Sequence, residues 1–258
     1  MRKLSACGIA FFLFFPLARA QVREHSNLYL KAGYYDWTEI EFGKRSMNEH
    51  GPLYAVGLER KLISRKNISV YGNAELWGGL VRYDGSEQFT NTPSKTNSGY
   101  FGTYEELLGD VRMGSFGKAS FGSLFGISHR AWFRTSGSEC WNVVSLRFGT
   151  RITRELSSGR SFFVHYGTTL PVISSDYAFL HSLGYTNTNF KPKNHASPFL
   201  EFGLKFPDGR KVSISYEAME FGSSHFTSIQ NLSNDSTRTL YQPASKSYTI
   251  WIKVSRTL

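Results

Sequence analysis

Apolar side chains occupy every second position in many short segments after residue 27. The longest such run begins at Ile68 and ends near Tyr83. Because successive side chains of an extended strand point to opposite faces, a period of two predicts β-strands. Ten strands are predicted in this way, at about residues 28–35, 53–62, 68–83, 103–113, 119–134, 141–152, 161–170, 198–206, 211–221 and 247–254.

The connections between the predicted strands alternate between long and short. Four of them are tight turns, and in the last of these Pro207, Asp208 and Gly209 each favour a turn for a separate backbone reason. Strands joined in this way are antiparallel. An even number of them predicts an up-and-down barrel with both chain termini on the side of the short turns. Long polar loops are expected at about residues 36–52, 84–102, 135–140, 171–196 and 222–246.

Strand length favours a membrane barrel over a soluble one, because strands of about nine residues or more can cross a bilayer at a tilt. Backbone groups inside the hydrocarbon must bond within the sheet, so the sheet has to close. The predicted fold class is therefore all-β, a closed antiparallel transmembrane barrel of about ten strands in a bacterial outer membrane. Its long loops are expected to be extracellular and its short turns periplasmic. After residue 20, no apolar stretch approaches the roughly twenty residues of a membrane helix.

Large aromatic residues on the apolar face gather near the strand ends. Such residues form girdles at the two membrane interfaces of outer-membrane barrels. The predicted outer girdle contains Tyr34, Tyr54, Phe133 and Tyr248, and the predicted periplasmic girdle contains Phe121, Phe162 and Phe206.

The opposite face carries charges of both signs within the strands, which would make it the lumen of a membrane barrel. Ten strands enclose little more space than the side-chain-filled barrels of eight. Pairing of Arg112, Arg130 and Arg147 with Glu106, Asp110 and Glu75 would fill this space, so we expect a plugged lumen rather than an open pore. Bulk is added by Tyr29, Tyr71, Trp77, Tyr104, Trp132 and Trp251. The full predicted charge network is Lys31, Glu59, Glu75, Glu106, Asp110, Arg112, Arg130, Arg147, Arg151, Glu201, Lys205, Glu217 and Lys253.

The first twenty residues have the features of a signal peptide. Two cations precede a short apolar run, and Ala18-Arg19-Ala20 offers small residues at both recognition positions of a signal peptidase. Cleavage is therefore expected after Ala20, which leaves residues 21–258 as one barrel domain. Cys7 would leave with the leader, so no intramolecular disulfide of Cys140 is expected.

The formal net charge is +10, and about +7 without the three cations of the leader. The positive residues are scattered rather than clustered, which argues against a nucleic-acid partner. We expect them to meet lipopolysaccharide phosphates and outer-membrane lipid. The other expected partner is the barrel-assembly machinery during biogenesis, and the mature protein is expected to be a monomer.

Candidate catalytic residues are sparse. Asp84, Asp176 and His181 lie in two predicted loops, where an acid and a histidine could hold a water between them. Ser128 and His129 are adjacent and must point to opposite faces of a strand, and His165 is expected to face the lumen. No cluster has metal-ligand spacing and no glycine-rich phosphate loop precedes a helix, so neither a metal nor another cofactor is expected.

The chain resembles the superfamily of small bacterial outer-membrane β-barrel proteins over nearly its whole mature length. The resemblance is carried by Leu30-Lys31-Ala32-Gly33-Tyr34-Tyr35, by residues 126–132 and 216–221, and by the terminal amphipathic strand. It implies the architecture rather than an activity, since such barrels include adhesins, pores, proteases and lipid-modifying enzymes. The chain ends in Leu258, where the superfamily pattern has a terminal aromatic residue.

Three functions remain open at this point. The leading one is a non-enzymatic barrel that acts in surface contact, adhesion or envelope structure through its extracellular loops. The second is a small porin-like solute channel. The third is an omptin-like surface hydrolase. A resemblance to omptin-type proteases would imply two acids near one loop and a closely spaced Asp-His pair near the opposite one. Asp84 has no second acid two positions away, and Asp176 and His181 do not have the close spacing of that pair.

Overall fold

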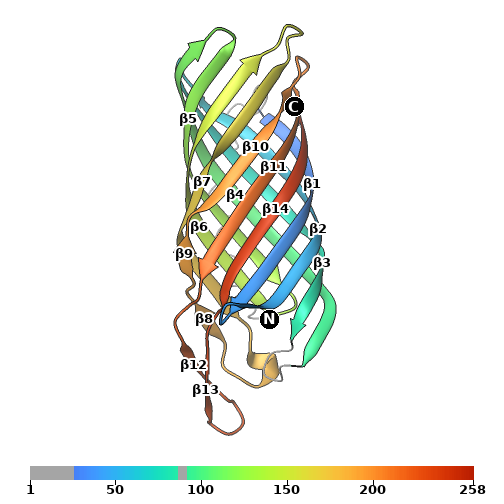
Figure 1. Ribbon diagram of the computed structural model, residues 1–258, viewed down its shortest axis with the longest axis vertical. Helices are drawn as coiled ribbons and strands as arrows, with labels where there is room; N and C mark the ends of the chain where they lie inside the picture. The colour runs from blue at the N-terminus through green and yellow to red at the C-terminus, as the bar shows by residue number, and fades with distance from the viewer. Residues whose placement is uncertain (1–25, 87–91) are drawn as a thin grey trace.

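The structure is a computed structural model and describes residues 26–86 and 92–258. Within these ranges ten antiparallel strands form one closed barrel, in which each strand pairs with its neighbours along the chain and β14 closes the wall against β1 (Figure 1). The expected fold class is confirmed. The wall consists of β1 (Ser26–Glu41), β2 (Lys44–Ser64), β3 (Ile68–Ser86), β4 (Pro93–Phe116), β5 (Ala119–Arg134), β6 (Glu139–Glu155), β7 (Ser161–Ala178), β10 (Ser197–Lys205), β11 (Arg210–Gly222) and β14 (Ala244–Thr257).

Side chains alternate between the outside and the inside of the wall as the sequence pattern predicts. In β1, Leu30 is 62% exposed, whereas Tyr29 and Tyr35 are almost fully buried. The same alternation along β14 exposes Ile250 and Ile252 and buries Trp251. Exposed aliphatic side chains are costly in water, so an exterior of this kind is suited to lipid.

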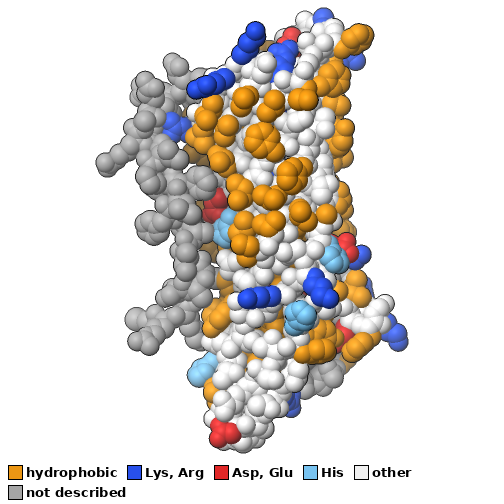
Figure 2. All heavy atoms as spheres, turned by 90° about the vertical axis from the view of Figure 1, so that its left-hand side faces the viewer, with side chains coloured by type: hydrophobic (Ala, Val, Ile, Leu, Met, Phe, Trp, Pro, Cys, Tyr) orange, Lys and Arg blue, Asp and Glu red, His pale blue; other side chains and the backbone are white. Residues whose placement is uncertain are grey.

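Exposed apolar side chains on each of the ten wall strands form a belt around the barrel. Figure 2 shows the belt on one face, with lysine and arginine side chains above and below it. Such a belt between polar edges is the outer surface expected of a barrel that crosses a membrane. The aromatic residues predicted for the girdles lie on this exterior: Tyr34, Tyr54, Phe121, Phe133, Phe162 and Tyr248 are exposed, and Phe206 is half-buried beneath the guanidinium groups of Arg160 and Arg210.

The four short turns connect the strands at one end of the barrel, as expected, but the long loops of the other end are largely wrong. The predicted loop at residues 36–52 is the continuation of β1 and β2, which meet at a two-residue turn of Phe42 and Gly43. Both turn residues have positive φ, as a tight hairpin turn requires. The predicted loop at 135–140 is a four-residue turn, and much of 84–102 belongs to β3 and β4. We call the end with these hairpins the hairpin end and the opposite end the short-turn end.

The last two long connections carry structure of their own at the hairpin end. The first holds a 3-10 helix, η2 (His181–Leu183), with β8 (Thr188–Phe190) and β9 (Lys193–His195), and the second holds a hairpin of β12 (Thr227–Gln230) and β13 (Thr237–Leu240). The hairpin extends well beyond the barrel in Figure 1. A small core buries Ala178, Leu180, Tyr185, Phe190 and Ile229 and joins these pieces to the end of β7.

No helix among the described residues is long and apolar enough to span a bilayer. The predicted signal peptide at residues 1–20, which contains Cys7 and ends at the expected cleavage site after Ala20, lies outside the described residues. The start of the domain at residue 21 also lies outside them. These three expectations therefore stay predictions.

Candidate functional site in the lumen

Aromatic rings from opposite walls meet across the hairpin half of the lumen. β1 and β6 are five positions apart in a ring of ten strands, which makes them diametrically opposed. The ring centroids of Trp37 on β1 and Trp141 on β6 nevertheless lie only 5.2 Å apart, and Trp141 stacks on Trp132 at 5.4 Å. Phe221 on β11 packs against Trp141 at 5.3 Å. These residues are at most 3% exposed, so the lumen is filled at this level.

A buried charge cluster lies beside the rings. The guanidinium of Arg134 on β5 contacts Glu39 at 3.1 Å, Glu49 at 3.4 Å and Glu139 at 2.6 Å. The indole nitrogens of Trp37 and Trp141 donate hydrogen bonds to Glu39 and Glu139, at 3.4 and 3.3 Å. We call the rings and this cluster together the plug, with Trp37, Trp132, Trp141, Phe221, Arg134, Glu39, Glu49 and Glu139 as its residues.

The charges of the plug are unbalanced. Among the described residues one arginine contacts three carboxylates, and Asp176 beside them is fully buried with neither carboxylate oxygen hydrogen-bonded to any of these residues. Burial raises the pKa of Glu39, and the neighbouring Glu139 and Glu49 raise it further against the opposing effect of Arg134. A raised pKa favours a proton on this carboxyl, which relieves part of the repulsion.

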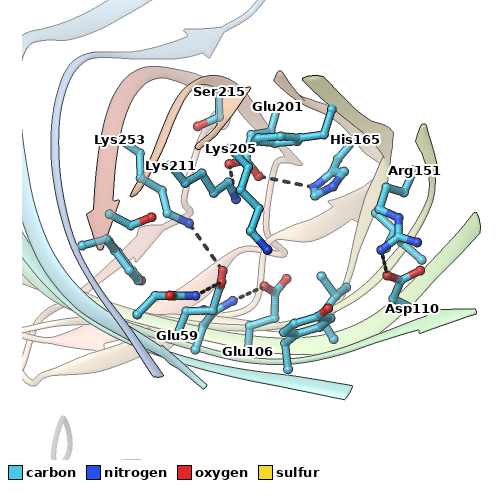
Figure 3. A pocket seen from close by; sticks show the side chains of 18 of the residues that line it. Glu59, Glu106, Asp110, Arg151, His165, Glu201, Lys205, Lys211, Ser215 and Lys253 are labelled. Carbon is cyan, nitrogen blue, oxygen red and sulfur yellow. Dashed lines mark hydrogen bonds and ion pairs between the residues drawn. The ribbon is translucent and has the colours of Figure 1, made fainter. Parts of the chain in front are cut away.

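The other half of the lumen holds a cavity of about 610 Å³ (Figure 3). Its lining includes Asn27, Gly209 and Thr257, which lie at the strand ends and turn of the short-turn end. The other lining residues reach inward to Tyr104 and Arg147, below the plug. This half of the lumen is therefore a chamber, here called the vestibule, and the plug closes its inner end.

The vestibule wall is held by ion pairs across neighbouring and distant strands. Six ion pairs and one histidine–carboxylate contact come from the predicted charge network or its neighbours, and most of their members are largely buried. They are Lys31–Glu75 at 2.6 Å, Arg130–Glu217 at 2.6 Å, Arg147–Glu106 at 2.7 Å, Lys211–Glu201 at 3.1 Å, His165–Glu201 at 3.5 Å, Lys253–Glu59 at 3.7 Å and the pair Arg151–Asp110.

Two residues of the predicted network lie apart from these pairs. Arg112 is exposed near the end of β4 and does not line the vestibule. Lys205 does line it, and Figure 3 shows its side chain reaching into the middle of the chamber. No ion pair of Lys205 is present among the described residues. The ammonium group is thus available to a carboxylate or phosphate that enters from the short-turn end.

The candidate catalytic residues do not form a site. Asp84 is paired with Lys95 at 3.5 Å near the end of β3, and both side chains are exposed. Asp176 is fully buried, whereas His181 is exposed on η2. Within the described ranges no hydrogen bond or ion pair joins Asp84, Asp176 and His181, and no cluster of His, Cys, Asp or Glu is arranged to hold a metal ion.

Comparison with solved structures agrees with the architecture. The outer membrane protease OmpT from Escherichia coli superposes with a TM-score of 0.52 at 9% identity, covering 92% of this chain and 98% of its own. The chain has the fold of a bacterial outer-membrane β-barrel. The transport unit of the autotransporter AIDA-I from Escherichia coli gives a TM-score of 0.50 at 9% identity, covering 93% and 92%. Identities this low establish the fold and no activity. Neither a protein-family model nor a curated protein matches the sequence.

The residues at the centre of the plug were not predicted as a site. Trp37, Glu39 and Glu49 lie in the segment predicted to be a loop, and Trp141 lies at the start of a predicted strand. The sequence does indicate that the first strand extends beyond Tyr35, because Tyr35, Trp37 and Glu39 continue the period of two that begins at Tyr29.

Proposed function

We propose that the protein is a non-conducting outer-membrane barrel that acts by surface contact through its hairpin end. The observation that carries this proposal is the plug. Trp37 and Trp141 touch across the barrel axis, and Arg134 ties β1, β2, β5 and β6 together beside them. A solute channel would need a continuous path at this level, so the structure favours contact over transport.

The connections at the hairpin end form an ordered surface. The small core around Leu180 and Ile229 orders the connections there. Exposed apolar side chains stand on the same end: Phe42 is 91% exposed at the tip of the β1–β2 turn, and Phe226 is 71% exposed before β12. Rigid aromatic tips of this kind are typical contact residues of protein and lipid interfaces.

Cations at the hairpin end favour an anionic partner, and we propose the phosphate groups of lipopolysaccharide. Lys44 and Arg45 are exposed directly after the Phe42-Gly43 turn, and Lys246 at the start of β14 is exposed and paired with Glu220 at 3.0 Å. Phosphates bind such side chains through charge-assisted hydrogen bonds, and each cation near an anionic surface contributes about 1 kcal/mol.

Binding to lipopolysaccharide tests the proposal. Barrels in phosphatidylcholine nanodiscs are presented with lipopolysaccharide vesicles, and the wild type is compared with Lys44→Glu/Arg45→Glu. Two charge reversals at an anionic surface should weaken binding by at least about tenfold. The matched control is Lys118→Glu in the turn between β4 and β5 at the short-turn end, which should bind as the wild type does. Equal binding by all three proteins would overturn the assigned partner.

A deletion tests the surface-contact role more broadly. Removing residues 227–240 deletes the β12–β13 hairpin, which is hydrogen-bonded outside the barrel wall. Adhesion of cells that display the shortened barrel should fall, while the heat-modifiable migration of the folded barrel on gels should persist. Adhesion that is unchanged in a correctly inserted barrel would contradict the role assigned to this end.

A further inference from the structure

A histidine and a glutamate form a hydrogen-bonded pair on the outer wall of the barrel. Nδ1 of His129 on β5 lies 2.9 Å from Oε2 of Glu105 on β4. The alternation along both strands places this pair outward, since Ile127 and Phe133 on β5 and Phe101 on β4 are exposed on the same face. Ser128 is buried on the opposite face of β5.

The pair belongs to a polar patch on an otherwise apolar wall. In the cross-strand register, Thr103 on β4 faces Ala131 on β5, which in turn faces Asn142 on β6. The next row contains Glu105 and His129, and the row after that is apolar, with Leu107 opposite Ile127. Ionisable side chains at membrane depth are costly and mark functional sites by default.

The patch lies just on the acyl side of the boundary between lipid headgroups and acyl chains. Phe101 and Phe133 face each other in the outer aromatic girdle, four residues along the strands from Glu105 and His129. At about 3.3 Å rise per residue and a tilt of about 40°, the pair lies roughly 10 Å further into the membrane. The headgroup layer is about 5–8 Å thick, so the pair lies only a few ångströms below the acyl linkages of a lipid.

The imidazole has one polar atom left for a ligand. Nδ1 is occupied by Glu105, and Nε2 has no hydrogen-bond partner among the described residues. The imidazole is the more exposed member, at 21% against 11% for the Glu105 side chain. A carboxylate that holds one ring nitrogen fixes the orientation of the other, as second groups do for histidines in many sites.

We propose that Glu105 and His129 form a lipid-binding site on the outer wall, in which Nε2 of His129 donates a hydrogen bond to an ester carbonyl oxygen of an acylated membrane lipid. One proton shared between Glu105 and Nδ1 and one on Nε2 leave the pair with no net charge in the acyl region. The proposal depends on the membrane orientation of the wall and is independent of the contact role of the hairpin end.

Ester- and ether-linked phosphatidylethanolamine distinguish the linkage from the headgroup. The two lipids share their headgroup and chains, but the ether form lacks the carbonyl oxygens. Lipid retained by the detergent-solubilised barrel is counted by native mass spectrometry over a titration. The wild type should bind the ester lipid about tenfold more tightly than the ether lipid, the effect of one desolvated hydrogen bond.

The matched variants are Glu105→Leu/His129→Phe, which makes the wall apolar at the pair, and Thr150→Val, which removes a hydroxyl from the outward face of β6 away from it. The first should bind both lipids equally, and the second should keep the tenfold preference. Equal binding of both lipids by the wild type would overturn the proposal, and so would a preference that survives in Glu105→Leu/His129→Phe. The wild-type comparison stands even if this variant fails to fold.

Discussion

Replacement of Arg134 by methionine should destabilise the barrel strongly. The guanidinium is the cation that contacts Glu39, Glu49 and Glu139, at 3.1, 3.4 and 2.6 Å, and all four side chains are at most 11% exposed. Methionine has similar length but no charge, so Arg134→Met leaves the three carboxylates facing one another.

The size of the effect follows from the buried environment. Removing one partner of a buried ion pair costs about 3–5 kcal/mol. Three pairs are broken here, but proton uptake by the carboxyls limits the repulsion that remains, so we expect about 4 kcal/mol in total. With a denaturant slope of about 2–3 kcal/mol per molar urea, the unfolding midpoint should fall by about 1.3–2 M.

Urea unfolding in lipid vesicles, followed by tryptophan fluorescence, measures this change. Trp37 and Trp141 both donate hydrogen bonds to the cluster, so their emission reports on the plug directly. A triple replacement of the three glutamates by glutamine, added to Arg134→Met, should restore part of the lost stability because it removes the unpaired charges. A midpoint that shifts by less than about 0.4 M in Arg134→Met, or no recovery in the combined variant, would refute the reasoning.

Two further changes follow from the same packing and charges. Burial and the neighbouring acids raise the pKa of Glu39, so the folded state holds this proton more tightly than the unfolded state. The free energy of unfolding should therefore fall as the pH rises from 4.5, the ordinary pKa of a glutamate, through the raised pKa of the folded state. Glu39→Gln should flatten this dependence in unfolding curves taken across that range, and an unchanged slope would exclude Glu39 as its source. Gly57→Ala should cost about 1–3 kcal/mol, because a Cβ at position 57 would overlap the ring of Tyr29. Gly114→Ala is its control, since a Cβ there meets nothing within 4 Å, and equal stability of the two variants would contradict this packing.

The wall of the barrel could be predicted from sequence because lipid imposes a strict pattern on it. Between Leu28 and Tyr34 every outward side chain must be apolar, so the period of two is visible in the residue types themselves. The same constraint made the ten strands and the four short turns recognisable, and the fold class was confirmed on this basis.

The strand extensions could not be predicted in the same way, because the constraint ends where the lipid ends. Beyond Tyr34 the outward residues Asp36 and Thr38 are polar, so the segment has the composition of a loop although it continues as β1. Trp37 points inward between them and becomes part of the plug. The contrast between an apolar outer face and a polar inner face ends at that point, while the backbone hydrogen bonds of β1 to its neighbouring strands continue.

The partners of the lumen charges were also beyond the reach of a single strand's pattern. The period of two predicts Arg130 and Arg147 on the inner face, and Glu75, Glu106 and Asp110 were the expected partners. Arg147 does meet Glu106, two strands away, but Arg130 meets Glu217 across the lumen on β11. Such pairings depend on closure and register around the whole ring, which periodicity along one strand does not contain.

Single-channel recording in planar bilayers tests the central claim, the closed lumen, most directly. The wild-type barrel should insert and remain electrically silent, because the rings of Trp37 and Trp141 meet across the axis. Trp37→Ala/Trp141→Ala removes both rings at that level and should give stepwise conductance, which shows that silent wild-type barrels are inserted and closed. Steady conductance by the wild type, equal to that of the double variant, would contradict the account.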